Sequence, residues 1–249
     1  MIEFIDACTR FGHSRRPLNG IVRDRGHITN IMDACQIKAS VVYHAASEEG
    51  DIGLGNERLI VEISGDERFI PQWIVTPKTF NDGLDPYILI EKMKKNGVKC
   101  ARIAPKSQGF SLERKAACAL IDALSEYNIP IFVNENQLGK SGIYDMCKLY
   151  PRARFIITNA GYGALREYFS LLEECRNMTI ETGSFVDHGG ISLVCGRFGA
   201  ERLVFGSCSP SMSSVGDARG LIMYSAISGE EKRMIAAENI KKILSEVAI

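Results

Sequence analysis

The sequence has no apolar run approaching the ~20 residues that a membrane-spanning helix needs, and it has no excess of either charge. Lysine and arginine total 30 residues, and aspartate and glutamate also total 30. A general binder of nucleic acid or of an anionic membrane needs a basic surplus, so we expect neither partner. The first segment has its apolar and charged residues in the wrong order for a signal peptide. We therefore expect a cytoplasmic protein.

The sequence also lacks any CxxC pair, although it contains eight cysteines. This absence argues against a zinc ribbon and against a thioredoxin-type motif. A chain of 249 residues can build a full apolar core, and such chains rarely need disulfides. We therefore expect free thiols. Two of them, Cys8 and Cys208, take on a special position below.

What is present is an alternation of short apolar runs with longer stretches of helical period. The short runs are apolar on nearly every residue, which is typical of strands buried on both faces of a parallel sheet. We predict strands at Glu3–Ala7, Ala39–His44, Phe69–Val75, Val98–Ile103, Ile131–Asn134, Arg154–Asn159, Met178–Glu181 and Arg202–Phe205.

Helical periodicity occupies the segments between these strands. We predict helices at Asn30–Ile37, Asn56–Ser64, Pro86–Asn96, Ser111–Tyr127, Lys140–Tyr150, Tyr162–Glu174, Gly190–Phe198 and Gly229–Val247. Eight strands with helical connections in about 250 residues predict an α/β protein with a (β/α)₈ TIM barrel as a single domain over residues 1–249. A doubly wound sheet is the alternative.

Four segments and the tail resemble the amidohydrolase-2 group of the amidohydrolase superfamily, which are TIM-barrel metal-dependent hydrolases and decarboxylases. The segments are Phe4–Gly12 (FIDACTRFG), Tyr150–Gly161 (YPRARFIITNAG), Asn177–Ser184 (NMTIETGS) and Phe198–Pro210 (FGAERLVFGSCSP). The tail from Ser228 to Leu244 is similar to the closing helix of that group. The segments follow one another in the family's order, and the last match is the most specific. The resemblance implies an amidohydrolase-like barrel, with hydrolysis of an amide or lactone, or decarboxylation, as its chemistry.

The departures from the family pattern concern its metal ligands. Where the resemblance implies histidines or an aspartate, this chain has Cys8, Arg10, Asn134, Asn159 and Cys208. Arg10 would repel a cation, and the other four are not the strong nitrogen or carboxylate ligands of a hard divalent ion. We therefore expect a degenerate metal site, with no metal and no other cofactor. Zinc held by Cys8 and Cys208 is a minor alternative.

The two cysteines should face each other, because the first and last strands of a closed barrel are neighbours. Three interpretations stay open for this pair: a soft-metal site, a redox pair or activated nucleophile, or two inert residues that fill the space of a lost metal.

In a TIM barrel the reacting groups lie at the C-terminal ends of the strands. The candidates for substrate binding there are Arg10, Arg102, Asn134, Asn159 and His188, and the candidates for acid–base catalysis are His44, Glu135 and Glu181. Arg10 and Arg102 could each bind a carboxylate in a bidentate way. Alternatively, they pair with Asp6 and Glu181 and only balance charge.

The sequence thus predicts a metal-independent, amidohydrolase-like hydrolase that acts on or binds a small polar or carboxylated molecule. The alternative is a catalytically inactive protein, a pseudoenzyme that keeps the fold as a ligand-binding or interaction module. A homo-oligomer is compatible with either function.

Overall fold

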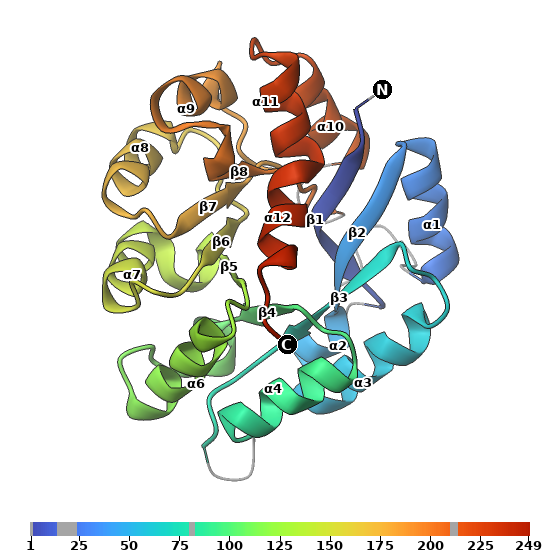
Figure 1. The fold of residues 1–249 in the computed structure, drawn as a ribbon, viewed down its shortest axis with the longest axis vertical. Coiled ribbons are helices and arrows are strands. Elements are labelled where there is room, and N and C mark those ends of the chain that lie inside the picture. The colour runs from blue at the N-terminus through green and yellow to red at the C-terminus, as the bar shows by residue number, and fades with distance from the viewer. Residues whose placement is uncertain (1, 14–23, 80–82, 210–213) are drawn as a thin grey trace.

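The computed structural model describes residues 2–13, 24–79, 83–209 and 214–249. Within these residues eight parallel strands follow one another around a single sheet in the order β1 to β8 (Figure 1). The strands are β1 (Phe4–Phe11), β2 (Ile37–His44), β3 (Phe69–Ile74), β4 (Cys100–Ile103), β5 (Ile131–Asn134), β6 (Phe155–Thr158), β7 (Met178–Glu181) and β8 (Leu203–Val204).

Helices connect the strands and form the outer ring that Figure 1 shows. They are α1 (Arg25–Ala34), α2 (Ala45–Glu49), α3 (Ile52–Ile63), α4 (Pro86–Lys95), α5 (Pro105–Gln108), α6 (Lys115–Glu126), α7 (Glu135–Leu149), α8 (Leu165–Glu174), α9 (Gly190–Phe198), the 3₁₀ turn η1 (Ala200–Arg202), α10 (Val215–Met223), α11 (Gly229–Arg233), the π-helical turn η2 (Met234–Glu238) and α12 (Asn239–Ser245). The predicted (β/α)₈ TIM barrel is confirmed.

The barrel closes where β1 meets the segment that contains β8. The Ala7 amide donates to the Phe205 carbonyl at 2.9 Å, and the Arg10 amide donates to the Ser209 carbonyl at 3.1 Å. Between these two hydrogen bonds, Thr9 and Ser209 form a parallel β-bridge. Closure therefore places the residues next to Thr9 and Ser209, which are Cys8 and Cys208, at the same seam.

The inside of the barrel is built in layers, because side chains two residues apart on a strand point to the same face. The lower layer is apolar and includes Ile5, Val41, Cys100, Phe132 and Ile156. The C-terminal helix α12 crosses the middle of the barrel in Figure 1 and packs its own apolar side chains against this layer. These strand residues lie at or near the strand starts, so α12 covers the N-terminal end of the barrel.

The next inward layer lies two residues further along the strands and is polar. Val41 is followed by Tyr43, Cys100 by Arg102, and Ile156 by Thr158. All three of the following side chains are buried. The apolar floor and the polar layer therefore come from the same strands.

Several predicted boundaries were wrong. The strand predicted at Glu3–Ala7 continues to Phe11, because the residues after Ala7 are also largely buried although several are polar. The predicted helix Asn30–Ile37 is instead α1, which Asp24 caps by accepting a hydrogen bond from the His27 amide, so that Ile37 begins β2. The helices α2 and α5 were not predicted, because each is only one turn long. No bounds were predicted for α10, in which two glycines interrupt the apolar residues.

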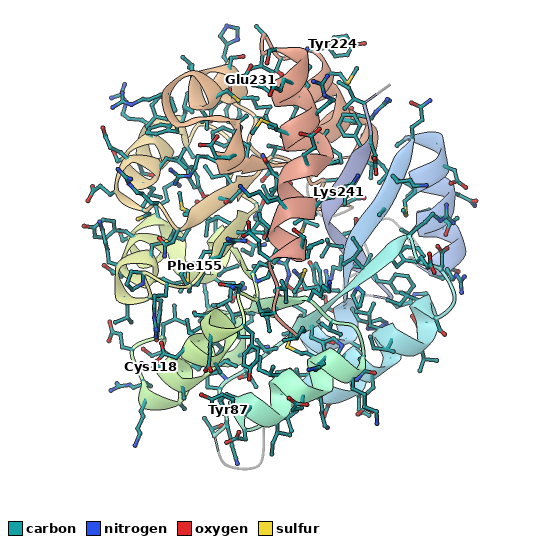
Figure 2. All side chains as sticks on the ribbon, in the orientation of Figure 1. Tyr87, Cys118, Phe155, Tyr224, Glu231 and Lys241 are labelled. Carbon is teal, nitrogen blue, oxygen red and sulfur yellow. The ribbon has the colours of Figure 1, made fainter. Side chains whose placement is uncertain are left out.

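The predicted helix Gly229–Val247 is present as one helical run of α11, η2 and α12 that ends at Ser245. Ser228 and Glu231 form a capping box at its start. Figure 2 shows Lys241 on the outer face of this run, where its ammonium lies 2.9 Å from Glu3. Among the described helices, none combines the length and the apolar character that crossing a membrane requires.

Candidate functional site

Two thiols and a carboxylate meet inside the C-terminal half of the barrel. The Sγ atoms of Cys8 and Cys208 are 3.2 Å apart, and the Cys208 Sγ lies 2.8 Å from Oε2 of Glu181. All three side chains are buried. The expectation that closure of the barrel brings Cys8 and Cys208 together is therefore confirmed, and Glu181 on β7 completes the group. We call these three residues the thiol centre.

Asp6 positions the backbone on both sides of the seam. Its Oδ1 accepts hydrogen bonds from the amides of Cys8 at 3.0 Å and Ser207 at 2.9 Å, and its Oδ2 accepts from the hydroxyls of Thr9 and Ser207. Burial raises the pKa of Asp6, and the four hydrogen bonds oppose that shift. Asp6 therefore links the two thiol-bearing segments. Among the described residues it pairs with neither Arg10 nor Arg102, so that alternative was wrong for Asp6.

Cys208 has a left-handed backbone conformation, with φ of +47°. This region is uncommon for residues other than glycine, and it costs on the order of 1 kcal/mol unless neighbouring contacts impose it. The hydrogen bonds of Ser207 to Asp6 impose it here. The conformation directs the Cys208 sulfur toward Cys8 and Glu181.

Arg102 on β4 is a buried cation that lies against Cys8. Its Nη2 donates to the Cys8 Sγ at 3.3 Å, its Nε donates to Oε1 of Gln72 at 2.7 Å, and its Nη1 donates to the Thr158 hydroxyl at 3.3 Å. The guanidinium also stacks on the Tyr43 ring at 4.2 Å. The alternative pairing of Arg102 with Glu181 was therefore wrong.

The surroundings of Arg102 leave Cys8 as its nearest potential anion. Among the described residues, no carboxylate oxygen lies within ion-pair distance of the Arg102 guanidinium. Burial acts to lower the pKa of Arg102, but the nearby Cys8 and Tyr43 outweigh burial and raise it. A buried charge without a partner is costly, so the hydrogen bond to Cys8 is one of the contacts that compensate the buried guanidinium.

Glu181 occupies a space that two glycines leave open. A Cβ atom on Gly206 would lie 2.5 Å from Cγ of Glu181, and one on Gly183 would lie 2.7 Å from its Oε1. Burial raises the pKa of Glu181 to about 7, although hydrogen bonds from Cys208 and the Gly183 amide act against the shift. The carboxyl group can therefore exchange a proton near neutral pH, which suits a general acid or base.

Two of the predicted substrate-binding residues lie side by side. Asn159 is buried, has a φ of +60°, and donates through Nδ2 to Oδ1 of Asn134 at 3.3 Å. The same Asn134 oxygen accepts from the Asn136 amide and so caps α7. Within the described residues the buried Oδ1 of Asn159 has no hydrogen-bond partner. An acceptor of this kind requires a ligand or a water molecule.

The other predicted residues are engaged away from the thiol centre. Arg10 is paired with Glu48 and Glu49 on α2. His44 caps α2 by accepting from the Ala46 amide through Nδ1, and its Nε2 lies 3.4 Å from Glu62; burial lowers its pKa. Glu135 contacts the ammonium of Lys140 and the hydroxyl of Tyr168. His188 is exposed in the loop before α9.

The contacts of Arg102 with Gln72 and Thr158 were not anticipated from the sequence. Both residues lie in runs that read as apolar strands, and their polar side chains point inward by the alternation of β3 and β6. A polar residue at an inward position of a buried strand is the signal that could have indicated them.

The family's metal ligands are not reproduced by these residues. Arg10 is cationic and paired, and the Asn134 amide oxygen is used as a helix cap. These side chains do not fit a hard divalent ion, which prefers oxygen ligands or imidazole. The ligand atoms of Cys8, Glu181 and Cys208 all lie within 4.8 Å of one another, so this group could hold only a softer ion such as zinc.

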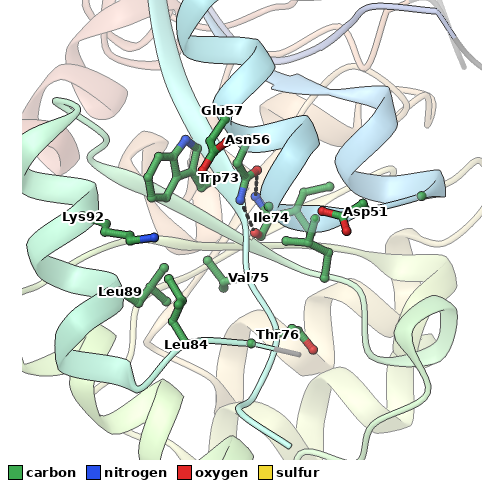
Figure 3. A pocket seen from close by; sticks show the side chains of 14 residues that line it. Asp51, Asn56, Glu57, Trp73, Ile74, Val75, Thr76, Leu84, Leu89 and Lys92 are labelled. Carbon is green, nitrogen blue, oxygen red and sulfur yellow. Dashed lines mark hydrogen bonds between the residues drawn. The ribbon is translucent and has the colours of Figure 1, made fainter. Parts of the chain in front are cut away.

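A pocket of about 460 Å³ lies between α3, the end of β3 and α4, and Figure 3 shows its apolar side at Trp73, Leu84 and Leu89. Ile52 and Ile74 line the pocket and also pack in the apolar cluster that contains both thiols. These two side chains therefore lie between the pocket and the thiol centre, whose own residues do not line the pocket.

Comparison with solved structures supports the amidohydrolase-like fold. A 2,6-dihydroxybenzoate decarboxylase from Rhizobium superposes with a TM-score of 0.79 at 12% identity, covering 98% of this chain and 99% of the other. A putative amidohydrolase from Staphylococcus aureus has a TM-score of 0.72 at 14% identity, covering 98% and 100%. A probable 2-pyrone-4,6-dicarboxylic acid hydrolase from Acinetobacter baumannii has a TM-score of 0.74 at 12% identity, covering 98% and 100%.

At these identities the similarity concerns the fold. It confirms the resemblance to amidohydrolase-2 structures at that level. No protein-family model matches the sequence, and no curated protein does either.

Proposed function

We propose that this protein is a metal-independent barrel hydrolase in which the thiolate of Cys8 attacks an amide or lactone of a small carboxylated molecule. The observation that carries the proposal is the contact between the buried Arg102 guanidinium and the Cys8 sulfur at 3.3 Å. The thiolate is the nucleophilic form of cysteine, and a neighbouring cation stabilises it. The structurally similar decarboxylases and hydrolases, by their names, act on carboxylated aromatic or pyrone compounds, which supports the substrate class.

The reaction divides into two steps that use Cys8 and Glu181. The Cys8 thiolate attacks the acyl carbon, a thioester forms, and the protonated carboxyl group of Glu181 supplies the proton that the leaving amine or alkoxide takes. Glu181, now a carboxylate, then accepts a proton from the water that hydrolyses the thioester, and Cys8 leaves as a thiolate. A group with a pKa near 7 can serve in both directions.

Two polar groups remain for the substrate. A guanidinium has five N–H donors, and the contacts of Arg102 with Gln72, Thr158 and Cys8 use three of them, so two N–H groups can bind a carboxylate or carbonyl oxygen. The unpartnered Oδ1 of Asn159 can accept a hydrogen bond from a hydroxyl or amide of the substrate. Both groups favour a small polar molecule over an apolar one.

A panel of carboxylated lactones, amides and aryl esters, assayed with chelator-treated protein, tests the proposal. We expect turnover that Cys8→Ala abolishes, together with a covalent acyl adduct on Cys8 in the wild type by mass spectrometry. Cys100→Ala is the matched control, because Cys100 is a buried thiol in the floor layer whose pKa burial raises to about 12. No turnover on any member, or equal activity of Cys8→Ala, would favour the non-catalytic ligand-binding alternative.

A zinc site is the second candidate, and the arrangement of Cys8, Glu181 and Cys208 is the observation that favours it. Two thiolates and a carboxylate are zinc ligands. Elemental analysis of protein purified without added metal separates the two candidates. One equivalent of zinc that is lost in both Cys8→Ser and Cys208→Ser would replace the metal-independent interpretation.

A further inference from the structure

The two sulfurs of the thiol centre are close enough to react with each other. Their separation of 3.2 Å exceeds the length of a disulfide bond, ~2.05 Å, by roughly 1 Å. They lie on segments that the Thr9–Ser209 bridge already holds together, so bond formation needs a small local shift and no rearrangement of the barrel. No disulfide links them, since all eight cysteines are free.

The environments of the two sulfurs differ in a way that assigns them different roles. Cys8 accepts a hydrogen bond from the buried Arg102 guanidinium at 3.3 Å, so we assign it the attacking role. Cys208 lies against the Glu181 carboxyl group at 2.8 Å, which can receive its proton. An attacking thiol with a second, resolving thiol next to it is an arrangement that redox-active cysteine pairs use.

We propose that Cys8 and Cys208 form a redox-active dithiol that a small hydroperoxide converts into a disulfide. The Cys8 sulfur attacks the terminal peroxide oxygen, the O–O bond breaks, and Cys8 becomes a sulfenic acid while its thiol proton passes to the alkoxide, which leaves as an alcohol. Cys208 then transfers its proton to Glu181, and its sulfur attacks the sulfenic sulfur. The S–S bond forms, and the leaving hydroxide takes that proton back from Glu181 to become water. Overall, one hydroperoxide and two thiols give one disulfide, one alcohol and one water.

The disulfide would also remove the proposed nucleophile from the site. The inference shares the Cys8 sulfur and its contact with Arg102 with the proposed function, but it does not depend on any hydrolytic reaction. An external dithiol such as dithiothreitol reverses the change, because thiol–disulfide exchange returns both cysteines to the reduced state.

The chain contains a second pair of buried cysteines that serves as an internal control. Cys147 and Cys175 interact through a side-chain hydrogen bond, and burial raises the pKa of both. The neighbouring Arg202 donates its hydrogen bonds to backbone carbonyls, including that of Cys175, and not to a sulfur. This pair therefore has proximity and a cation nearby, but neither sulfur accepts a hydrogen bond from the Arg202 guanidinium as Cys8 does from Arg102.

The experiment is oxidation of reduced, EDTA-treated protein with one equivalent of hydrogen peroxide, followed by N-ethylmaleimide and peptide mass spectrometry without reduction. We expect a linked Cys8–Cys208 peptide pair that appears roughly tenfold faster than any Cys147–Cys175 link, because Cys8 accepts a hydrogen bond from a guanidinium and the Arg202 guanidinium donates to carbonyls instead. Cys208→Ser should instead accumulate a sulfenic acid on Cys8 that dimedone traps. The Cys147→Ser variant should form the Cys8–Cys208 link at the wild-type rate.

Two results would overturn the inference: a Cys147–Cys175 link that forms as fast as the Cys8–Cys208 link, or oxidation of Cys8 to sulfinic acid with no link. If Cys208→Ser does not fold, Glu181→Gln gives the second test, because loss of the proton acceptor should slow the link and let the Cys8 sulfenic acid accumulate. The pH dependence of Cys8 alkylation by iodoacetamide, compared in wild type and Arg102→Gln, tests ionisation separately. A Cys8 that alkylates fast at neutral pH but never links refutes the dithiol and leaves the proposed hydrolase standing.

Discussion

The two ends of the barrel interior are built by the same strands and serve opposite purposes. At the N-terminal end an apolar floor of residues such as Val41, Cys100 and Ile156 packs against α12. Two residues further along, the same strands present Tyr43, Arg102 and Thr158. The floor stabilises the fold by burying apolar area, whereas the polar layer buries a cation and titratable groups that cost free energy. Residues that stabilise the fold and residues that form the candidate site are therefore only two positions apart on the same strands.

Among substitutions in the two layers, we expect the largest effect from Cys8 in the polar layer, and we expect it on turnover. If the thiolate is the nucleophile, Cys8→Ala should lower the rate of hydrolysis on the order of 10³-fold or more. Its free energy of unfolding should fall by about 1–3 kcal/mol, because the substitution leaves a small cavity and removes one hydrogen-bond acceptor of the buried Arg102. Rates on the active substrate and urea unfolding of the same preparation measure both quantities. A Cys100→Ala variant with wild-type stability but lowered turnover would contradict the separation of the two layers.

The next effect is on stability, at the floor. Ile240 is fully buried in the cluster that closes the barrel. Ile240→Ala should lower the free energy of unfolding by about 2–5 kcal/mol, through lost apolar burial and the cavity left behind. Turnover per folded molecule should stay at the wild-type value, and so should the rate of Cys8 alkylation. Denaturant titration and an activity assay at a temperature where the variant is folded provide the measurements.

The free energy of unfolding should depend on pH through Glu181, a titratable residue that is buried above the floor. Burial raises the pKa of Glu181 to about 7, so between its ordinary value of 4.5 and about 7 the folded state binds more protons than the unfolded state. The contribution of this group is therefore fully present below pH 4.5 and is lost as the pH rises through 7. The loss is on the order of 3 kcal/mol at most.

Unfolding by urea at a series of pH values from 5 to 8, in wild type and Glu181→Gln, isolates this contribution. We expect the difference in stability between the two proteins to change across that range and to level off on the alkaline side. Parallel curves at every pH would mean that the Glu181 carboxyl group does not change protonation there.

The smallest effect should come from the outer face of the helix that closes the floor. Lys241 and Glu3 form an ion pair at 2.9 Å, with both side chains close to half exposed. Water screens such pairs, so Lys241→Ala should change the free energy of unfolding by less than about 1 kcal/mol. Thermal unfolding of Lys241→Ala is measured in parallel with that of Ile240→Ala, since Ile240 is one residue away on the inner face of the same helix. A loss as large as that of Ile240→Ala would show that α12 is not held mainly by its apolar face.

Much of the architecture could be read from local patterns. All eight strands were located, since each is a short apolar run between turn residues, and barrel closure then implied that Cys8 and Cys208 are neighbours. The additional helices α2, α5 and α10 could not be read in the same way, because tertiary contacts rather than an apolar period stabilise them. The ion-pair partners of Arg10 were missed for this reason, because Glu48 and Glu49 lie on α2.

The candidate site was only partly predictable for the same reason. Arg102 and Glu181 were expected at the C-terminal end of the barrel, but their partners come from strands that are distant in the sequence. Thr158 is 56 residues from Arg102, and Cys208 is 27 residues from Glu181. No local pattern specifies which of several polar residues will meet across a barrel.

The sequence by itself determined the order of strands and helices and the seam where the first and last strands meet, because these follow from local periodicity. That Cys8, Arg10, Asn134, Asn159 and Cys208 occupy positions of metal ligands is implied by the resemblance alone and stays a prediction. Only the tertiary structure decided that Arg102 contacts Cys8 rather than a carboxylate, and that Glu181 lies against Cys208. Charge compensation inside a barrel depends on distances between distant strands, and those distances exist only after the chain has closed.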